Sequence, residues 1–241
     1  TKDYRKELLN DNLLDEVAEQ FIINYEDAQK WYPRGAKVSP SYVIITTPGE
    51  SAAVDTLVKW KTSLGYQVKV VTTTWIDSLY SGSDLAEKIR NFLIDKYPAS
   101  EWAINYVLII GNSSDIPMRK CWPDSEWHTN YQYYNPVPTD YYYADLTGDW
   151  DLNNDEVFGD SGGYPFGDRG PGGVDFAPEV FVGRIPVYNN DYASLDAILQ
   201  KIMDYETASG DISWRKKMLL PMAISNYENE NGNSFAHRTD G

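Results

Sequence analysis

The chain has 241 residues, a hydrophobic fraction of 42% and a net charge of −15 at pH 7, because 36 Asp and Glu outnumber 21 Lys and Arg. This length and hydrophobic fraction predict a folded protein with a full core. The negative charge argues against partners such as nucleic acid or an anionic membrane surface, which require clustered Lys and Arg. No apolar run approaches the length of a membrane span, so we expect no membrane insertion.

The first forty residues predict a helical lead-in. In LLDEVAEQFIINYEDAQKW the apolar residues recur at helical spacing, and Pro33 and Gly35 end the pattern. We therefore expect a lead-in segment over 1–39 and one α/β domain over 40–241.

Three apolar segments then predict strands. They are YVIITT (42–47), YQVKVVTT (66–73) and NYVLIIG (105–111), and their continuous apolar and β-branched character is typical of strands buried on both faces. Amphipathic helices are predicted between them. This alternation favours a mostly parallel sheet with helices on both faces, whose ligand site lies beyond the carboxyl ends of the strands. GNSSDIP (111–117) occupies one such end.

The two helices predicted between the strands have recognisable ends. The first, SAAVDTLVKWKTSLG, has Ser51 as its expected N-cap and Gly65 as its stop. The second, DLAEKIRNFLIDKYP, has Asp84 as its expected N-cap and ends at Pro98.

Residues 117–178 interrupt this pattern, since they are rich in Trp, Tyr, Pro, Gly and Asp and contain no clear helix. An irregular segment of that length predicts a function or a bound ion. Regular structure is expected to resume with a strand in EVFVGRIPV (179–187), a helix over 194–208 and a strand over 216–225.

Four of these segments, in order, carry a family resemblance. YVIITTPGE, NYVLIIGNSSDIP, TDYYYADL and PEVFVGRIPV resemble the amino-terminal half of the gingipain-type cysteine peptidases. The resemblance covers roughly 40–241 and implies a caspase-like three-layer α/β sandwich, truncated at its C-terminal side. It also implies proteolysis by a cysteine nucleophile with a His as general base.

The catalytic pair of that family has no counterpart among the Cys and His residues present. The family places a His before a Gly and a Cys after the next strand, whereas here His128 precedes Thr129 and His237 precedes Arg238. Cys121 is the only cysteine and comes before the GRIPV strand. We therefore expect the chain to end before the catalytic His and Cys, with no catalytic residue in it. A separate dyad of Cys121 and His128 remains a weaker alternative to an inert, partly buried thiol.

The acidic stretch DLTGDWDLNNDEVFGD (145–160) predicts a structural calcium site. Its oxygen-bearing side chains alternate as in a calcium loop, and Asn154 takes the sixth position, which requires a positive φ. The candidate ligands are Asp149, Asp151, Asn153, Asp155 and Asp160, with Asp145 as a possible addition. The alternative is a solvated acidic surface loop.

The aromatic segment 122–143 allows two interpretations. It could form a platform for a sugar or a peptide, or its rings could pack a long loop onto the sheet, which is the more common use of such clusters. Acid pairs such as Asp124 with Glu126, or Asp140 with Asp145, raise glycoside hydrolysis as a further hypothesis.

Three further charged residues have expected roles in positioning loops or substrate. Arg184 is expected to be buried, to pair with a carboxylate and to position a loop. Asp115 is expected to cap the turn after its strand. Asp240 is the acid nearest to the position of the specificity pocket in arginine-specific gingipains, but the alignment there does not establish an Arg preference.

These observations predict the amino-terminal portion of a gingipain-like cysteine endopeptidase that acts on protein or peptide substrates. The composition and the resemblance favour an extracellular or cell-surface location. The alternative is a non-catalytic, calcium-dependent binding or assembly domain on a peptidase-like fold.

Overall fold

The computed structural model of the protein describes residue 27 and residues 41–121, 136–160, 167–168, 171–175, 177–208, 210–211 and 213. The chain divides into two compact units, Thr1–Gln200 and Lys201–Gly241. The description below concerns the first unit. The expected strand at 216–225 and nearly all of the expected lead-in lie outside the described residues, so the boundary at residue 40 stays a prediction.

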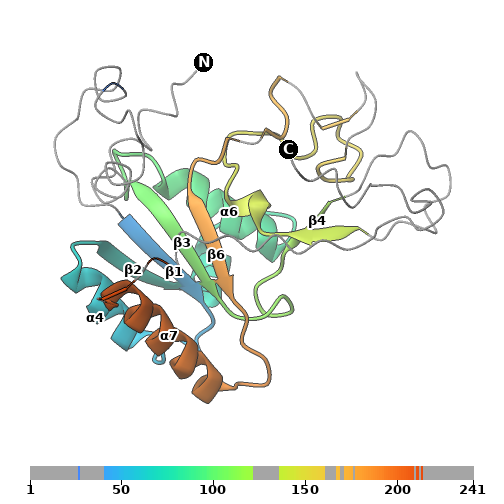
Figure 1. Cartoon of the computed structure of the whole chain (residues 1–241). Coiled ribbons are helices and arrows are strands. Elements are labelled where there is room, and N and C mark those ends of the chain that lie inside the picture. Colours follow the sequence, from blue (N-terminus) through green and yellow to red (C-terminus); the bar gives the residue numbers. More distant parts are fainter. Residues whose placement is uncertain are drawn as a thin grey trace, which may run out of the picture. The chain divides into compact units, whose positions relative to one another are not determined.

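A four-stranded parallel sheet forms the centre of this unit (Figure 1). Its strands are β1 (Ser41–Thr46), β2 (Gln67–Thr72), β3 (Ile104–Ile110) and β6 (Phe181–Ile185), in the order β2-β1-β3-β6. All four predicted strands in the described part are therefore confirmed. The two central strands are almost entirely buried, as their continuous apolar sequences predicted.

Helices α5 (Thr73–Leu79) and α6 (Leu85–Lys96) cover one face of the sheet (Figure 1). Val43 and Val107 from the central strands join Phe92 of α6 in one buried apolar cluster. These side chains are at most 2% exposed, so the cluster supplies the main hydrophobic stabilisation of the unit.

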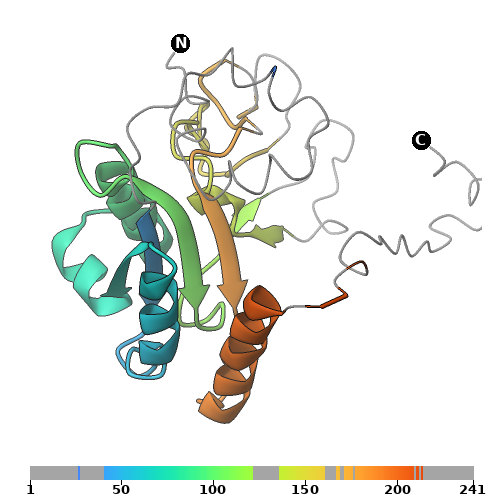
Figure 2. The same ribbon diagram turned by 60° about the vertical axis from the view of Figure 1, so that its left-hand side comes forward.

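Helix α4 (Asp55–Ser63) lies on the other face, as Figure 2 shows. Its buried residues Leu57 and Lys61 lie one helical turn apart, and the Lys61 ammonium lies 5.3 Å from the centre of the Tyr42 ring of β1. Lys61 thus buries its aliphatic stem while its charge contacts aromatic faces. The expected α/β architecture with helices on both faces is confirmed.

The helix ends confirm part of the prediction and correct part. Asp84 caps α6, because its side chain accepts a hydrogen bond from the Glu87 N–H. The expected cap at Ser51 is wrong: α4 begins only at Asp55, and the Ser51 hydroxyl donates to the Pro48 carbonyl instead. Helix α5 was not predicted, and Thr72 caps it directly at the end of β2.

The described parts of 117–178 contain only short elements. These are strands β4 (Arg119–Cys121) and β5 (Val137–Thr139), which pair antiparallel, and the 3₁₀ helix η1 (Tyr141–Tyr143). After β6, the chain enters α7 (Tyr192–Thr207), near the predicted 194–208; this helix begins in the first unit and continues past its boundary at Gln200.

The strand order creates a switch point between β1 and β3, because the chain leaves β1 towards β2 and leaves β3 towards β6. Crevices for ligands in such sheets form at this point, beyond the carboxyl ends of the strands. Within the described residues, no helix is both long enough and apolar enough to cross a membrane.

Candidate functional site

Buried carboxylates hold the acidic segment that follows η1. Asp145 is fully buried, and its two oxygens accept hydrogen bonds from the Gly148 N–H at 2.8 Å and the Asp175 N–H at 3.2 Å. Glu179 accepts from the Leu146 N–H at 2.6 Å. Burial raises the pKa of both carboxyl groups. An irregular segment has no regular backbone hydrogen bonds, so these carboxylates accept its backbone N–H groups instead.

The positive charge beside this segment comes from α6. Arg90 donates hydrogen bonds to the carbonyl oxygens of Tyr142, Asp145 and Gly148, at 2.6 to 3.2 Å. Its guanidinium carbon lies 5.1 Å from the centre of the Tyr142 ring. Burial lowers the pKa of Arg90. One arginine therefore ties the irregular segment to the helix that packs on the sheet.

A second arginine comes from β4. Arg119 forms a two-pronged ion pair with Asp84 at 2.8 and 3.0 Å, and its guanidinium lies between the rings of Tyr142 and Phe158. Planar stacking combined with a bidentate carboxylate contact is a geometry that Arg provides and Lys does not. The acidic stretch contains no Lys or Arg of its own. The guanidinium groups of Arg90 and Arg119 supply the positive charge beside it.

The predicted calcium ligands form a turn-rich loop. Asp151 accepts from the N–H groups of Asp155 and Glu156, at 2.8 and 3.2 Å. Asn154 has φ of 58°, the left-handed conformation expected at the sixth loop position.

Asp160 lies apart from this exposed loop. It is buried and accepts from the Asp168 N–H, while Asp168 accepts from the Leu152 and Asp160 N–H groups. Among the residues that the structure describes, no three His, Cys, Asp or Glu side chains form a group that could hold a metal ion. Calcium binding through the five predicted residues therefore stays a prediction.

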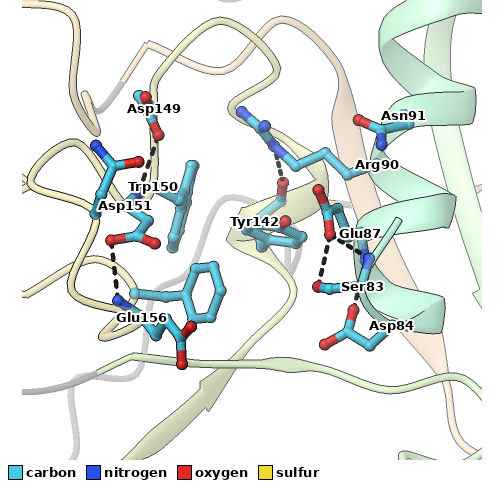
Figure 3. A pocket seen from close by; sticks show the side chains of 12 residues that line it. Ser83, Asp84, Glu87, Arg90, Asn91, Tyr142, Asp149, Trp150, Asp151 and Glu156 are labelled. Atoms are coloured by element: carbon cyan, nitrogen blue, oxygen red, sulfur yellow. Dashed lines mark hydrogen bonds between the residues drawn. The ribbon is translucent and has the colours of Figure 1, made fainter. Parts of the chain in front are cut away.

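A pocket of about 590 Å³ lies between α6 and the acidic loop (Figure 3). Figure 3 shows Glu87 and Arg90 of α6 facing Asp149 and Asp151 of the loop, with aromatic rings between them. The complete lining is Ser83, Asp84, Glu87, Arg90, Asn91, Tyr142, Asp149, Trp150, Asp151, Asn154, Glu156 and Phe158. The pocket therefore combines carboxylates, amides and one guanidinium with an apolar part.

Arg184 holds together the segments at the carboxyl edge of the sheet. Its guanidinium pairs with Asp140 at 2.7 and 2.8 Å and donates to the carbonyl oxygens of Gly111 and Ile116 at 3.0 and 2.9 Å. The predicted buried arginine that pairs with a carboxylate and positions a loop is confirmed. The turn cap expected from Asp115 comes from Asn112, whose side-chain oxygen accepts the N–H groups of the turn.

Glu50 occupies the switch point itself. The side chain is 3% exposed, and its Oε2 accepts from the hydroxyls of Thr46 and Thr47. A Cβ placed on Gly111, at the end of β3, would lie 3.4 Å from the same oxygen. Glu50 thus brings a buried carboxylate to the edge where this class of fold places its ligands.

Cys121 has the properties of a packing residue. It is half-buried in β4, packs against the main apolar cluster, and burial raises the pKa of its thiol to about 11. A thiol of that pKa is a poor nucleophile at neutral pH. His128 and His237 lie outside the described residues, as do Asp124, Glu126 and Asp240.

The aromatic segment is used for packing where it is described. Tyr142 and Tyr143 are buried, at 3% and 0% exposure, and Tyr142 meets Trp150 edge to face at 5.1 Å. The acids Asp140 and Asp145 are both engaged, the first with Arg184 and the second with backbone N–H groups. Described residues of this segment thus favour the packing interpretation.

Sequence reasoning missed Arg90, Glu50 and Asp168 as members of these sites. Arg90 and Glu50 stand in ordinary helix and turn sequences, and Asp168 follows a Gly-rich stretch. Each acquires its partners only through contacts between distant segments. A single sequence carries no signal for them.

The fold and the carboxyl edge define an α/β protein of the parallel, doubly wound class. The chain matches the model of peptidase family C25 over residues 36–237 and belongs to that family. A comparison with curated proteins finds no match.

Two similar solved structures are the Arg-specific cysteine proteinase gingipain R (RgpB) and the complex of the pro- and mature domains of Porphyromonas gingivalis RgpB. Each is 18% identical with a TM-score of 0.46, and each match covers 69% of this chain. The chain spans 28% and 29% of their respective lengths.

Proposed function

We propose that this chain is the amino-terminal portion of a gingipain-like cysteine endopeptidase and that Cys121 is not its nucleophile. In this proposal the parallel sheet supplies part of a caspase-like domain. The nucleophile and its general base come from a longer gene product, and the substrates are proteins or peptides. An extracellular or cell-surface location belongs to the same proposal.

Membership in peptidase family C25 is the observation that carries this function. The position of Cys121 supports the second part. Its sulfur lies 3.3 Å from where a Cβ on Gly159 would be, so it packs against the acidic loop. A nucleophile needs a lowered pKa and access to substrate, and this thiol has a raised pKa and is half-buried.

A covalent-labelling experiment tests the proposal. The 241-residue chain and the longer product of its gene are each incubated with a peptidyl chloromethyl ketone, and the labelled residue is identified by peptide mass mapping. We expect the longer product to be labelled at a cysteine other than Cys121 and to cleave peptides. Labelling of Cys121 with loss of peptidase activity would overturn the proposal, as would a longer product without any reactive cysteine.

We also propose that the acidic loop binds calcium as a structural ion. The left-handed Asn154 and the oxygen-rich side chains of Asp149, Asp151, Asn153 and Asp155 support it, because Ca²⁺ favours several hard oxygen ligands in irregular geometry. Asp160 does not share the exposed loop, so a site would need other oxygens to complete it. If the longer product proves to have no peptidase chemistry, a calcium-dependent binding domain becomes the better description.

A further inference from the structure

We propose that a row of aromatic side chains at the amino end of the sheet is the docking surface for the lead-in segment (1–39) of the same chain. This aromatic row consists of Tyr66, Tyr42, Tyr106 and Phe181. The peptidase function proposed above gives the lead-in segment no place, so the inference goes beyond that function.

The aromatic row crosses the sheet where its strands begin. Tyr42 of β1 pairs in register with Tyr106 of β3, and Tyr106 pairs with Phe181 of β6. In both pairs the rings are stacked, with centres 6.0 and 5.6 Å apart. Tyr66, just before β2, meets Tyr42 edge to face at 5.7 Å. The four rings therefore form one continuous aromatic surface across neighbouring strands.

This row lies on the face of the sheet that carries α4. Successive side chains of a strand point to opposite faces, and Val43, next to Tyr42, belongs to the apolar cluster under α6. The Lys61 ammonium, in the last turn of α4, lies 5.3 and 5.4 Å from the centres of the Tyr42 and Tyr66 rings. Helix α4 therefore reaches the end of the row that is close to β2.

The opposite end of the row, at β6, is partly open to solvent. Phe181 is 40% exposed, and Tyr106 beside it is half-buried. Aromatic rings stabilise a protein mainly through the large surface that they remove from water. A continuous aromatic surface that still reaches solvent is typical of a site where another segment or partner binds.

The lead-in segment is the occupant that the chain brings closest to this surface. It leads directly into β1, whose second residue is Tyr42. Its sequence predicts a helix with one apolar face, formed by Leu14, Val17, Phe21, Tyr25 and Ala28. The described residue Asp27 is helical and exposed, as expected for a position outside that apolar face.

The dimensions of the segment fit the row. A helix over residues 14–28 would be about 22 Å long, and four neighbouring strands span about 14 Å. Residues 29–41 connect this predicted helix to β1 and can extend over about 40 Å. The helix can therefore cover the whole row without moving the start of β1.

Charge favours this occupant over a second copy of the chain. Residues 11–28 carry six carboxylates and no Lys or Arg, whereas the row has the Lys61 ammonium at its α4 end. Opposite charges attract the predicted helix to this surface. Two copies of the chain would each bring a net charge of −15 and would repel each other.

Photo-crosslinking of the full chain tests the proposal. The photoreactive amino acid p-benzoylphenylalanine replaces Phe181, and ¹⁵N-labelled and unlabelled chains are mixed before irradiation. Peptide mass mapping then identifies the crosslinked residues and shows whether they belong to the same chain. We expect the main crosslink to join position 181 to residues 14–28 of the same chain.

The control carries the same photoreactive amino acid in place of Leu79, which is 62% exposed on α5, on the other face of the sheet. It should not crosslink to residues 14–28. Crosslinks from position 181 to another chain would assign the row to a second copy. Crosslinks to other segments, or none at all, would show that the lead-in segment does not dock there. Each of these results would overturn the proposal.

Melting temperatures give a second readout. Phe21→Ala should lower the melting temperature by about 4–8 °C, because it removes an apolar ring from the proposed contact. Glu19→Ala, on the opposite face of the same predicted helix, is the matched control and should change it by less than about 2 °C. In a Phe181→Ala background the loss caused by Phe21→Ala should fall to half or less, since contacting residues are coupled.

Equal losses from Phe21→Ala in the two backgrounds, or equal effects of Phe21→Ala and Glu19→Ala, would also overturn the proposal. Neither the crosslinks nor the melting temperatures depend on peptidase activity. A failure of the docking proposal is therefore distinguishable from a failure of the proposed peptidase function.

Discussion

The central sheet and the acidic segment are held together by opposite kinds of side chain. In the sheet, Val43, Ile44 and Ile45 are fully buried apolar residues in a regular parallel ladder. In the acidic segment (145–160) and beside it, the fully buried carboxylates of Asp145 and Asp168 accept hydrogen bonds from backbone N–H groups. The first region is stabilised by removing apolar surface from water, and the second by pairing polar groups that are costly to bury.

This difference predicts different sensitivities. Apolar packing responds to lost volume and very little to charge. A polar segment responds to the loss of single partners, to pH and to bound ions, because an unpaired buried group keeps its full desolvation cost. The following experiments separate the two regions on these grounds.

The largest effect is expected in the core. Phe92 is fully buried and meets Trp75 and Trp102 at ring distances of 5.9 and 5.5 Å. Phe92→Ala should lower the free energy of unfolding by about 3–5 kcal/mol, measured by urea denaturation. Leu79→Ala is the control, since Leu79 is 62% exposed and should cost less than about 0.5 kcal/mol. Similar losses in the two variants would contradict this account of the core.

The next effect concerns Arg90. Arg90→Met keeps the aliphatic stem but leaves three carbonyl oxygens without their donor, so we expect a loss of about 3 kcal/mol in urea denaturation. The control Lys88→Met on the same helix breaks only an exposed pair with Asp77 and should cost less than about 1 kcal/mol. If Arg90→Met cost no more than the control, the acidic segment would not depend on this arginine.

Calcium should have a smaller effect, confined to the acidic segment. An ion that binds only the folded state raises the melting temperature, here by about 2–6 °C between chelator and excess calcium. Asp151→Asn should reduce this difference, whereas Asp196→Asn, which removes an exposed carboxylate on α7, should not. A melting temperature that is the same with calcium and with chelator would remove the proposed ion.

The smallest effect is a pH dependence of opposite sign at two carboxylates. Burial raises the pKa of Glu179 above its ordinary 4.5, so its contribution to stability is present below 4.5 and is lost as pH rises through the folded pKa. Burial alone would raise the pKa of Asp84 too. The hydrogen bonds from Arg119 and from the Glu87 N–H outweigh it and lower this pKa below 3.8. The stability that Asp84 contributes is therefore present above 3.8 and is lost as pH falls.

Urea denaturation of Glu179→Gln and Asp84→Asn across pH measures both slopes. The stability of the wild type relative to Glu179→Gln should fall as pH rises from 4.5. Relative to Asp84→Asn it should rise with pH around and below 3.8. Slopes of the same sign would show that the two carboxylates do not differ in environment.

Much of the sheet was predictable because its signals are local. The apolar runs near 42–47 and 105–111 became β1 and β3, and Asp84 capped α6 as its sequence context indicated. Helix α5 was missed because TTWIDSL follows β2 without a turn or breaker residue. The prediction that Ser51 caps α4 was wrong because turns follow Ser51 and α4 begins only at Asp55.

The sequence by itself determined the parallel sheet, the faces of its helices, the buried role of Arg184 and the left-handed conformation that Asn154 adopts. These follow from periodicity and residue chemistry, which act over a few neighbouring positions. Only the tertiary structure decided that Arg90 and Arg119 stand beside the acidic segment, that Glu50 reaches the end of β3, and that α6 and the loop enclose a pocket. Those arrangements join residues far apart in the chain, such as Arg90 and Gly148, which are 58 positions apart and share a hydrogen bond. Their pairing energy exists only once the core has brought the segments together.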